Sequence, residues 1–310
     1  MTLSLVTGGA GFIGSHLARS LLEAGDSVRV LDDLSTGKKE NLEGLGIELT
    51  VGDIRDEHLV REACEGVDRV FHLAALASVA ASMRAPLQYY DVNLLGSVNV
   101  LRAAVDSGVS RVVLASSAAV YGNTNGVVHE DTEKHPLSPY ADAKLAMESA
   151  ARTFSSAYGL PVVALRFFNV YGPRQSPDSA YAAVIPLFIL AMLNGEAVKI
   201  EGDGKQTRDF VFVGDIVRAL LIASVREAAV GGVFNVGGGR SISILELAQT
   251  LQRIFPESPP PVHVAPREGD IRFSEASVER IRTALEYRPN TDLIDGLRIT
   301  VQWFRDKERK

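Results

Sequence analysis

The sequence predicts an α/β protein that begins with a doubly wound parallel sheet and continues into a smaller α/β domain. Three observations lead to this prediction. Short apolar runs alternate with helical stretches as far as about residue 115, a glycine-rich turn separates the first run from the first helix, and small or polar residues follow several of the runs. We expect the first domain over residues 1–170, with a return segment near 205–238, and the second domain over residues 171–310.

The first strand, Leu3–Val6, is followed by a glycine-rich turn and by a helix over Ser15–Ala24. Three glycines of the turn (Gly8, Gly11 and Gly14) allow a tight turn, close approach of the backbone to a pyrophosphate, and close packing of the helix on the strand. The N–H groups at the helix N-terminus favour phosphate at the same place. The pattern predicts a Rossmann-type site for a dinucleotide.

Asp32 stands at the end of the second strand, Val28–Leu31, about 20 residues after the glycine turn. Its carboxylate can accept hydrogen bonds from both hydroxyls of an adenosine ribose. The alternative interpretation is a strand-end acid that only caps a loop. Lys38 and Lys39 could meet a 2′-phosphate instead, but Asp32 would repel one, so NAD is favoured over NADP.

The third strand is predicted over Ile47–Val51, and Asp53 and Ile54 follow it. An adenine bound at this edge needs a polar contact and an apolar wall, which these two residues can supply. Asp53 could equally cap a helix that begins near Glu57. Both interpretations stay open from the sequence.

The fourth strand begins at Val70 and runs into a turn of small residues that includes Ala74, which lets a cofactor lie close. His72 lies among apolar residues of this strand and is interpreted as a core histidine rather than a catalytic one. A long helix is predicted over Leu87–Val105, and the side chain of its Asn93 could bond inside a helix–strand junction.

The fifth strand, Arg111–Ala115, ends at Ser116 and Ser117. In a parallel sheet, ligands bind beyond the carboxyl ends of the strands. These serines and the glycine turn therefore lie at the same edge of the sheet.

Tyr140 and Lys144 stand four residues apart after Pro139, which suits the first turn of a helix. Positions i and i+4 share a helix face, so the phenol and the ammonium can point into one site. A cation beside a phenol lowers its pKa, and the spacing therefore predicts a base that acts near neutral pH. Surface helices also contain this spacing, so its place after the glycine turn and Ser117 decides its meaning.

Hydrophobic side chains make up 46% of the 310 residues and charged ones 23%, as in ordinary globular proteins. The net charge is −6 and no long basic run is present, so we expect no nucleic-acid partner. Cys64 is the only cysteine, which excludes an internal disulfide and fits a reducing cytoplasm. No leader segment and no apolar run of about 18 residues is visible, so we expect a cytoplasmic protein that does not enter a membrane, and we predict no metal ligands.

With these residues assembled, the chain resembles the extended short-chain dehydrogenases/reductases of the nucleotide-sugar (UDP-galactose/UDP-glucose type) 4-epimerase family. The resemblance covers nearly the whole chain and implies NAD as cofactor and a nucleotide sugar as substrate. The motifs that carry it are Thr7–Gly14, Asp32–Gly37, His72–Ala75, Ser116–Gly122, Tyr140 with Lys144, Arg166–Arg174, Gly202–Gly204, Arg208–Val211 and Arg267–Asp270.

The resemblance implies that Tyr140 takes the proton of the sugar 4-hydroxyl. Lys144 would bond the nicotinamide ribose and lower the pKa of Tyr140, and Ser117 would hydrogen-bond the 4-oxygen. The alternative for Ser117 is a strand-end serine that satisfies backbone groups. The expected cofactor-binding residues are Gly8, Gly11, Phe12, Ile13, Gly14, Asp32, Asp53, Ile54, Ala74, Tyr140 and Lys144.

The later chain resembles the substrate side of the family. Asn169, Arg208 and Arg267 match the residues that bond the nucleotide diphosphate, where the two arginines are favoured as bidentate donors. Val184 would face the nucleotide base, although it could equally begin a buried helix. Arg267 and Asp270 belong to a motif after which a residue borders the sugar 2-position.

We align that last residue with Ser274, with Arg272 as the alternative. A small serine leaves room for an acetamido group, so plain and N-acetylated UDP-hexoses are both expected substrates. The competing interpretation of Ser274 is the cap of a helix that begins near Glu275.

Ala118 and Ala119 distinguish the possible chemistries. The related 4,6-dehydratases carry Asp-Glu at this place, because eliminating water needs a general acid and a base, and alanine can be neither. UDP-glucuronate decarboxylases also usually carry a carboxylate here. The alternatives are another nucleotide-sugar enzyme of this kind (a UDP-glucuronate 4-epimerase or decarboxylase, or a 4,6-dehydratase) and a non-catalytic NAD-binding protein, although the last would be expected to lose Tyr140 or Lys144.

The resemblance further implies a homodimer formed through the helices near Leu87–Val105 and Tyr140–Tyr158. Small residues of these helices would allow close approach of the two subunits. They are Ala103, Ala104, Ala146, Ala150 and Ala151.

Overall fold

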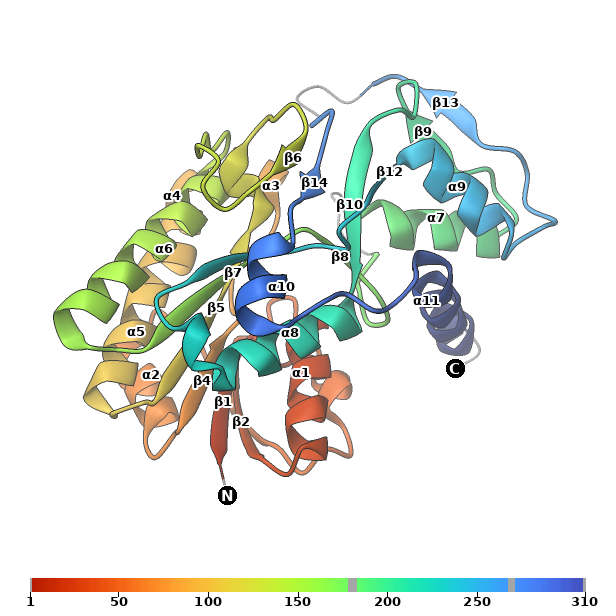
Figure 1. The fold of residues 1–310 in the computed structure, drawn as a ribbon. Helices are drawn as coiled ribbons and strands as arrows, with labels where there is room; N and C mark the ends of the chain where they lie inside the picture. The colour runs from red at the N-terminus through yellow and green to blue at the C-terminus, as the bar shows by residue number, and fades with distance from the viewer. Residues whose placement is uncertain (1, 178–182, 267–270, 309–310) are drawn as a thin grey trace.

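A seven-stranded parallel sheet with the strand order β3–β2–β1–β4–β5–β7–β11 forms the centre of the protein (Figure 1). The computed structural model describes residues 2–177, 183–266 and 271–308. The strands of this sheet are β1 (Leu3–Thr7), β2 (Ser27–Asp32), β3 (Glu48–Val51), β4 (Arg69–His72), β5 (Arg111–Ser117), β7 (Val162–Phe167) and β11 (Val233–Val236). Each neighbouring pair is parallel, and the predicted doubly wound α/β fold is confirmed.

Helices cover both faces of this sheet and build a hydrophobic core on each side. The first layer consists of α1 (Phe12–Glu23), α8 (Val213–Val225) and α10 (Glu279–Leu285). The second consists of α2 (Glu57–Cys64), α5 (Ser97–Asp106) and α6 (Pro139–Tyr158). Because both faces are covered, the central strands are buried along their length. Their sequences are therefore continuous apolar runs, such as residues 112–115.

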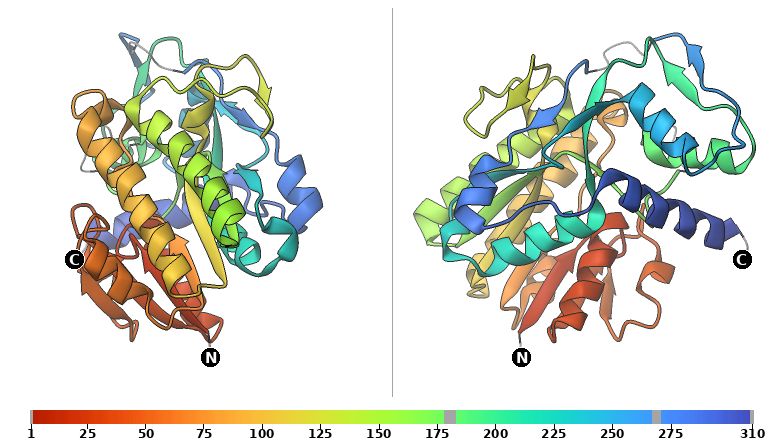
Figure 2. Two further views of the ribbon diagram at one scale, coloured as in Figure 1. Left: turned by 90° about the vertical axis from the view of Figure 1, so that its left-hand side faces the viewer. Right: turned by 45° about the vertical axis from the view of Figure 1, so that its right-hand side comes forward.

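The second part of the chain packs around a core of its own. The pair of β6 (Val127–Val128) with β14 (Glu275–Ala276) joins the two parts of the chain and belongs to a separate small cluster. The strands of the second part are β8 (Asn169–Tyr171), β10 (Thr207–Phe212) and β12 (Ser241–Ser243) in one sheet, and β9 (Lys199–Glu201) paired with β13 (Val262–Val264). Its helices are α7 (Val184–Leu193), α9 (Ile244–Gln252) and α11 (Leu293–Glu308), which Figure 2 shows grouped away from α2 and α5.

The chain returns to the first sheet after β10, where α8 and β11 join the first layer and the sheet edge. Helix α10 packs in the same core, so the chain returns to the first domain a second time, which the sequence did not indicate. The division near residue 170 remains a prediction.

The long helix predicted over residues 87–105 is divided into three parts. These are α4 (Pro86–Tyr90), a π-helical segment (Asp91–Gly96) and α5. The Asn93 side chain in the π segment accepts a hydrogen bond from the Leu76 N–H at 2.8 Å and donates to the Leu76 carbonyl at 2.9 Å, which confirms its predicted role at a helix–strand junction. Single π turns within helices are frequent beside functional sites.

The remaining short helices are α3 (Val79–Ser82) and three 3₁₀ segments, Lys39–Leu42, Ala118–Tyr121 and Glu227–Ala229. Helix α1 begins at Phe12 rather than at the predicted Ser15, because the backbone turns helical directly after Gly11. No helix in the described part of the chain is long and apolar enough to cross a membrane.

Candidate active site

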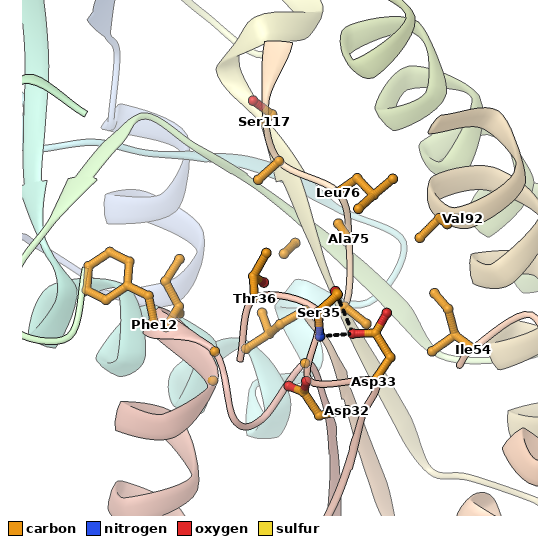
Figure 3. Close-up of a pocket in the computed structure, with 18 of the residues that line it drawn as sticks. Phe12, Asp32, Asp33, Ser35, Thr36, Ile54, Ala75, Leu76, Val92 and Ser117 are labelled. Atoms are coloured by element: carbon orange, nitrogen blue, oxygen red, sulfur yellow. Dashed lines mark hydrogen bonds between the residues drawn. The ribbon is translucent and has the colours of Figure 1, made fainter. Parts of the chain in front are cut away.

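A cavity of about 340 Å³ opens at the carboxyl ends of the parallel strands, where the strand order reverses between β1 and β4. Figure 3 shows Asp32 and Asp33 at one end of the cavity and Ser117 at the other. The lining contains all the residues predicted for the cofactor, together with Ser117. These are Gly8, Gly11, Phe12, Ile13, Gly14, Asp32, Asp53, Ile54, Ala74, Tyr140 and Lys144.

The glycine turn is packed too tightly for larger side chains. Gly8 has a φ of +71°, and a Cβ placed there would lie 2.7 Å from the Ala74 nitrogen. A Cβ on Gly14 would lie 2.1 Å from the Gly8 carbonyl oxygen, so α1 rests directly on the turn. The α1 N-terminus has no side-chain cap and no acidic residue in its first turn. A phosphate can therefore approach its N–H groups, and the turn fits the pyrophosphate of a dinucleotide.

Asp32 is buried and holds the turn together as well as lining the cavity. Its Oδ2 accepts a hydrogen bond from the Ala10 N–H at 2.9 Å, and its Oδ1 accepts one from the Leu34 N–H at 2.8 Å. Burial raises the pKa of Asp32, and these backbone donors act against that shift. Loop capping, the alternative interpretation, is thus observed, while ribose binding by the same carboxylate remains a prediction.

Asp53 and Ile54 line the cavity beyond β3. The Arg55 guanidinium hydrogen-bonds the Asp53 carboxylate and lowers the pKa of Asp53. The interpretation of Asp53 as a helix cap is wrong, because Asp56 is the N-cap of α2 and accepts from the His58 and Leu59 N–H groups.

His72 is a core residue, as predicted, with 1% of its surface exposed. Its Nδ1 lies 2.7 Å from the Thr7 hydroxyl and its Nε2 lies 2.8 Å from the Ser97 hydroxyl. Burial lowers the pKa of His72 to about 3, and the nearby Lys144 adds to this shift. The imidazole is therefore neutral and joins β4 to α5.

Tyr140 and Lys144 extend from the first turns of α6, whose start is fixed by Pro139 and by the Ser138 side chain, which accepts from the Ala141 N–H at 3.2 Å. The Lys144 ammonium is buried and donates to the Ala115 carbonyl at 2.8 Å, at the end of β5. Burial lowers the pKa of Lys144 to about 8, against the opposing effect of the Glu148 carboxylate.

Burial raises the pKa of Tyr140, while a hydrogen bond with Ser117 lowers it and the neighbouring Tyr89 raises it. The Tyr89 ring meets the Tyr140 ring edge-on, with centroids 6.4 Å apart. In the chain by itself burial dominates and the pKa of Tyr140 is raised, while the lowering effect of Lys144 beside a bound cofactor remains a prediction.

For Ser117 the alternative interpretation, a serine that satisfies a backbone group, is observed, while its contact with the sugar 4-oxygen remains a prediction. Its hydroxyl accepts a hydrogen bond from the Ala119 N–H at 3.1 Å, which satisfies a backbone group, and it also hydrogen-bonds Tyr140 inside the cavity. Ser116, one residue earlier, donates instead to Glu148 in α6 at 2.5 Å.

The residues predicted for the substrate lie around β8 and β10. The Asn169 amide donates to the Asp209 carbonyl at 3.1 Å, and the Arg208 guanidinium donates to the Thr207 and Ile271 carbonyls. Val184 begins α7, so the interpretation as the start of a buried helix is confirmed, while contact with a nucleotide base remains a prediction.

Arg267 and Asp270 lie outside the described residues. Ser274 is half-buried and is not among the described residues that line the cavity. The interpretation of Ser274 as a helix cap is wrong, because β14 follows it and α10 begins only at Glu279. Arg272, the alternative gate, forms an exposed ion pair with Asp203 at 2.9 Å.

The sequence analysis missed several residues that line the cavity. They are Asp33, Ser35, Thr36, Leu76, Val92, Phe168 and Val170. Asp33 accepts from the Ser35 N–H and hydroxyl, which shapes the loop after β2 (Figure 3). Position directly after a strand end was a signal for Asp33 and Phe168. Val92 belongs to the π segment and Leu76 is hydrogen-bonded by Asn93 of that segment, which the sequence did not predict. No group of three or more possible metal ligands occurs among the residues that the structure describes.

Comparison with known proteins places this site in a family. A family model described as the NAD dependent epimerase/dehydratase family matches residues 4–237. A UDP-glucose 4-epimerase of Mycolicibacterium smegmatis is 40% identical over 313 residues, covering 99% of both chains. A UDP-N-acetyl-alpha-D-glucosaminuronate decarboxylase of Bacillus cytotoxicus is 37% identical over 320 residues, covering 98% of both.

A similar solved structure is the UDP-glucose 4-epimerase of Thermotoga maritima with UDP-glucose. It superposes with a TM-score of 0.95 at 39% identity, covering 99% of this chain and 100% of that one. The predicted cofactor, NAD, and the predicted resemblance are both confirmed at the level of the family. With an NAD site at the switch point of its parallel sheet, this chain belongs to the NAD dependent epimerase/dehydratase family.

Proposed function

We propose that this chain is a UDP-sugar 4-epimerase that interconverts UDP-glucose and UDP-galactose. The observation that carries the proposal is the meeting of Tyr140, Ser117 and Lys144 at one end of the dinucleotide cavity. The similarity to UDP-glucose 4-epimerases over nearly the whole chain supports the same assignment.

In the proposed reaction, Tyr140 accepts the proton of the sugar 4-hydroxyl while Ser117 hydrogen-bonds the same oxygen as it becomes a ketone. Lys144 supplies positive charge beside them. Bound NAD would take the hydride from C4 and return it to the other face, and its positively charged ring would favour the phenolate of Tyr140. The diphosphate would be anchored by Asn169, Arg208 and Arg267 while the 4-keto sugar rotates to present its other face.

The charges of the cavity favour epimerisation over elimination. The carboxylates among the described lining residues are Asp32, Asp33 and Asp53, and the first two lie at the opposite end from Ser117 (Figure 3). Ala118 and Ala119 follow Ser117 and carry no acid or base. A 4,6-dehydratase would need both groups beside the sugar.

The cavity also favours a sugar without a C6 carboxylate. Lys144 is the one cation among the described residues that line it, and its ammonium donates to Ala115. A hexuronate would need a donor for its carboxylate at this end. UDP-glucuronate 4-epimerase and UDP-glucuronate decarboxylase are therefore the second choices.

The test is to incubate the purified protein with UDP-glucose, UDP-galactose, their N-acetyl forms and UDP-glucuronate, and to identify the products by NMR. We expect the C4 epimers of the uncharged hexoses. A 4-keto-6-deoxy sugar, a pentose, or turnover of UDP-glucuronate alone would overturn the proposal. An absorbance change at the reduced cofactor band on adding UDP-sugar would separate an enzyme from a non-catalytic NAD-binding protein.

We further propose that Ser274 borders the sugar 2-position. Ser274→Tyr is expected to lower the turnover of UDP-N-acetylglucosamine sharply while sparing UDP-galactose, because the ring would fill the space of the acetamido group. The kinetics of both substrates measure this. Arg272→Tyr is the matched variant, since Arg272 points to Asp203, and it should spare both substrates. Equal loss on both substrates in Ser274→Tyr, or no loss on either, would show that Ser274 is not the gate.

We also propose a homodimer through the outer face of α4, α5 and α6; Figure 2 shows α4 and α5 as one continuous run beside α6. Leu87 of α4 is 83% exposed, and Leu95 of the π segment between α4 and α5 is 56% exposed. The small residues Ala103, Ala104 and Ala151 are buried in the core instead, so the expectation that they allow close approach of two subunits is wrong. Light scattering should give twice the chain mass at micromolar concentration, and Leu87→Asp with Leu95→Asp should reduce it to the monomer mass. A monomeric wild-type protein would refute the dimer.

A further inference from the structure

A buried ionic network lies one helical turn beyond Lys144. Glu148 in α6 has a fully buried side chain, and Arg166 in β7 has a side chain that is 3% exposed. Arg166 Nε donates to Glu148 Oε1 at 2.9 Å, and Arg166 Nη2 donates to Glu148 Oε2 at 2.7 Å. Burying two charges costs desolvation energy, and an apolar pair of similar size is often as stable. Stability alone is therefore a weak reason for a charged pair at this place.

The network joins the two elements that carry the proposed catalytic groups. The Ser116 hydroxyl donates to Glu148 Oε1 at 2.5 Å, which ties the end of β5 to α6. Successive side chains of a strand point to opposite faces, so a fixed Ser116 also fixes the direction of Ser117. Lys144 stands four residues before Glu148 on the same face of α6. Its ammonium donates to the Ala115 carbonyl of β5.

Glu148 also acts on the charge of Lys144. Burial lowers the pKa of Lys144 to about 8, and the Glu148 carboxylate opposes that shift. The other groups near Lys144 bring no negative charge: Tyr140 on α6 has a raised pKa and is a neutral phenol, and His72 on β4 is neutral. Arg166 on β7 is positive and is paired with Glu148.

We propose that Glu148 is a positioning residue, which holds the end of β5 against α6 and keeps the Lys144 ammonium charged under working conditions. The role in turnover rests on the proposed epimerase function, whereas the role in cofactor binding does not. A neutral Lys144 would lose its attraction for the nicotinamide ribose and its support of a Tyr140 phenolate.

The first test follows NAD affinity against pH by calorimetry, because this readout needs no sugar. In the wild-type protein the affinity should fall as the pH rises through about 8, where Lys144 loses its proton. Glu148→Gln removes the negative charge that opposes the effect of burial, and this change lowers the pKa of Lys144. The fall should therefore begin at lower pH, by roughly half to one unit. An unchanged pH dependence with only a loss of stability would overturn the proposal.

Two further variants keep this test decisive. Glu148→Gln leaves a buried charge unpaired and can prevent folding, whereas the double variant Glu148→Gln with Arg166→Gln leaves none. The double variant should also move the fall in NAD affinity to lower pH, because Glu148 is the charged group that acts on Lys144. A double variant with the wild-type pH dependence would overturn the proposal. Glu148→Asp keeps the charge and should restore the wild-type pH dependence, and failure of that rescue would count against a charge effect.

The matched control is Glu130→Gln. Glu130 is also buried and belongs to the same polar region, where its Oε1 accepts from the Asn235 N–H at 2.8 Å, and its carbonyl accepts from Arg166. It is not among the charges that act on Lys144. Its variant should lose stability and keep the wild-type pH dependence; an equal shift in this control would show general loosening and overturn the proposal.

Turnover gives the second readout. At pH 8.5, Glu148→Gln should lower kcat for UDP-galactose several-fold more than at pH 7, with little change in KM, since Glu148 does not contact the substrate. If the wild-type protein has no epimerase activity while the NAD affinities shift as expected, the proposed function fails and the role of Glu148 in cofactor binding stands.

Discussion

Tyr140→Phe should lower kcat by about 10²–10⁴-fold, because it removes the group that accepts the 4-hydroxyl proton. NAD should remain bound, since Phe keeps the ring that packs edge-on against Tyr89 and leaves Lys144 bonded to Ala115. Steady-state kinetics on UDP-galactose and NAD calorimetry on the same preparation measure the two effects. Turnover close to that of the wild type would show that another group is the base.

Ser117→Ala is the matched comparison for this result. It removes the hydrogen bond of Ser117 to the sugar 4-oxygen and its hydrogen bond with Tyr140. We therefore expect a smaller loss of kcat, roughly 10²–10³-fold, as for the removal of an oxyanion donor. The same variant also removes the acceptor of the Ala119 N–H, and thermal unfolding should show a small decrease in stability. A Ser117→Ala variant more impaired than Tyr140→Phe would reverse the roles that we propose.

Gly14→Ala should abolish NAD binding and destabilise the protein. The new Cβ would lie 2.1 Å from the Gly8 carbonyl oxygen and 2.7 Å from the Gly9 Cα, and both are backbone atoms of the turn. The added methyl group overpacks the contact between α1 and the turn, at a cost of roughly 1–3 kcal/mol, and α1 would have to shift to relieve it. Calorimetry with NAD and chemical unfolding measure both losses.

Two other glycines serve as controls for this result. A Cβ on Gly11 would meet only the Gly8 carbonyl oxygen, at 3.1 Å, so Gly11→Ala should fold but bind NAD more weakly, because the methyl group narrows the approach of the pyrophosphate. A Cβ on Gly46 meets nothing within 4 Å, and Gly46→Ala should behave as the wild type. If Gly14→Ala bound NAD with wild-type affinity, close packing of α1 on the turn would not be needed for the site.

The cofactor-binding part of the candidate site could be predicted from the sequence because its residues lie at or just after the ends of strands. Gly8, Gly14 and Asp32 follow β1 or end β2, and the position of a residue after a parallel strand already determines which edge of the sheet it occupies. Tyr140 and Lys144 were recognised by their spacing on one helix, which the start of α6 at Pro139 confirms.

Residues that depend on contacts distant in the sequence could not be predicted in this way. The cap of α2 was missed for a different, local reason: Asp53 pairs with Arg55, whereas Asp56 accepts from the His58 and Leu59 N–H groups, and their spacing from α2 did not distinguish them. Ser274 looked like a helix cap, yet its segment pairs through β14 with β6, about 150 residues earlier in the chain.

The sequence by itself determined the fold class, the dinucleotide turn, NAD as the cofactor and the Ser117, Tyr140 and Lys144 set, because glycine conformation, strand periodicity and helix spacing are local properties. The tertiary structure decided the protonation of these groups. Lys144 is bonded to Ala115, Tyr140 has a raised pKa, and Glu148 lies buried beneath them. A pKa depends on burial and on charges brought together from distant parts of the chain, and only the packed structure specifies those.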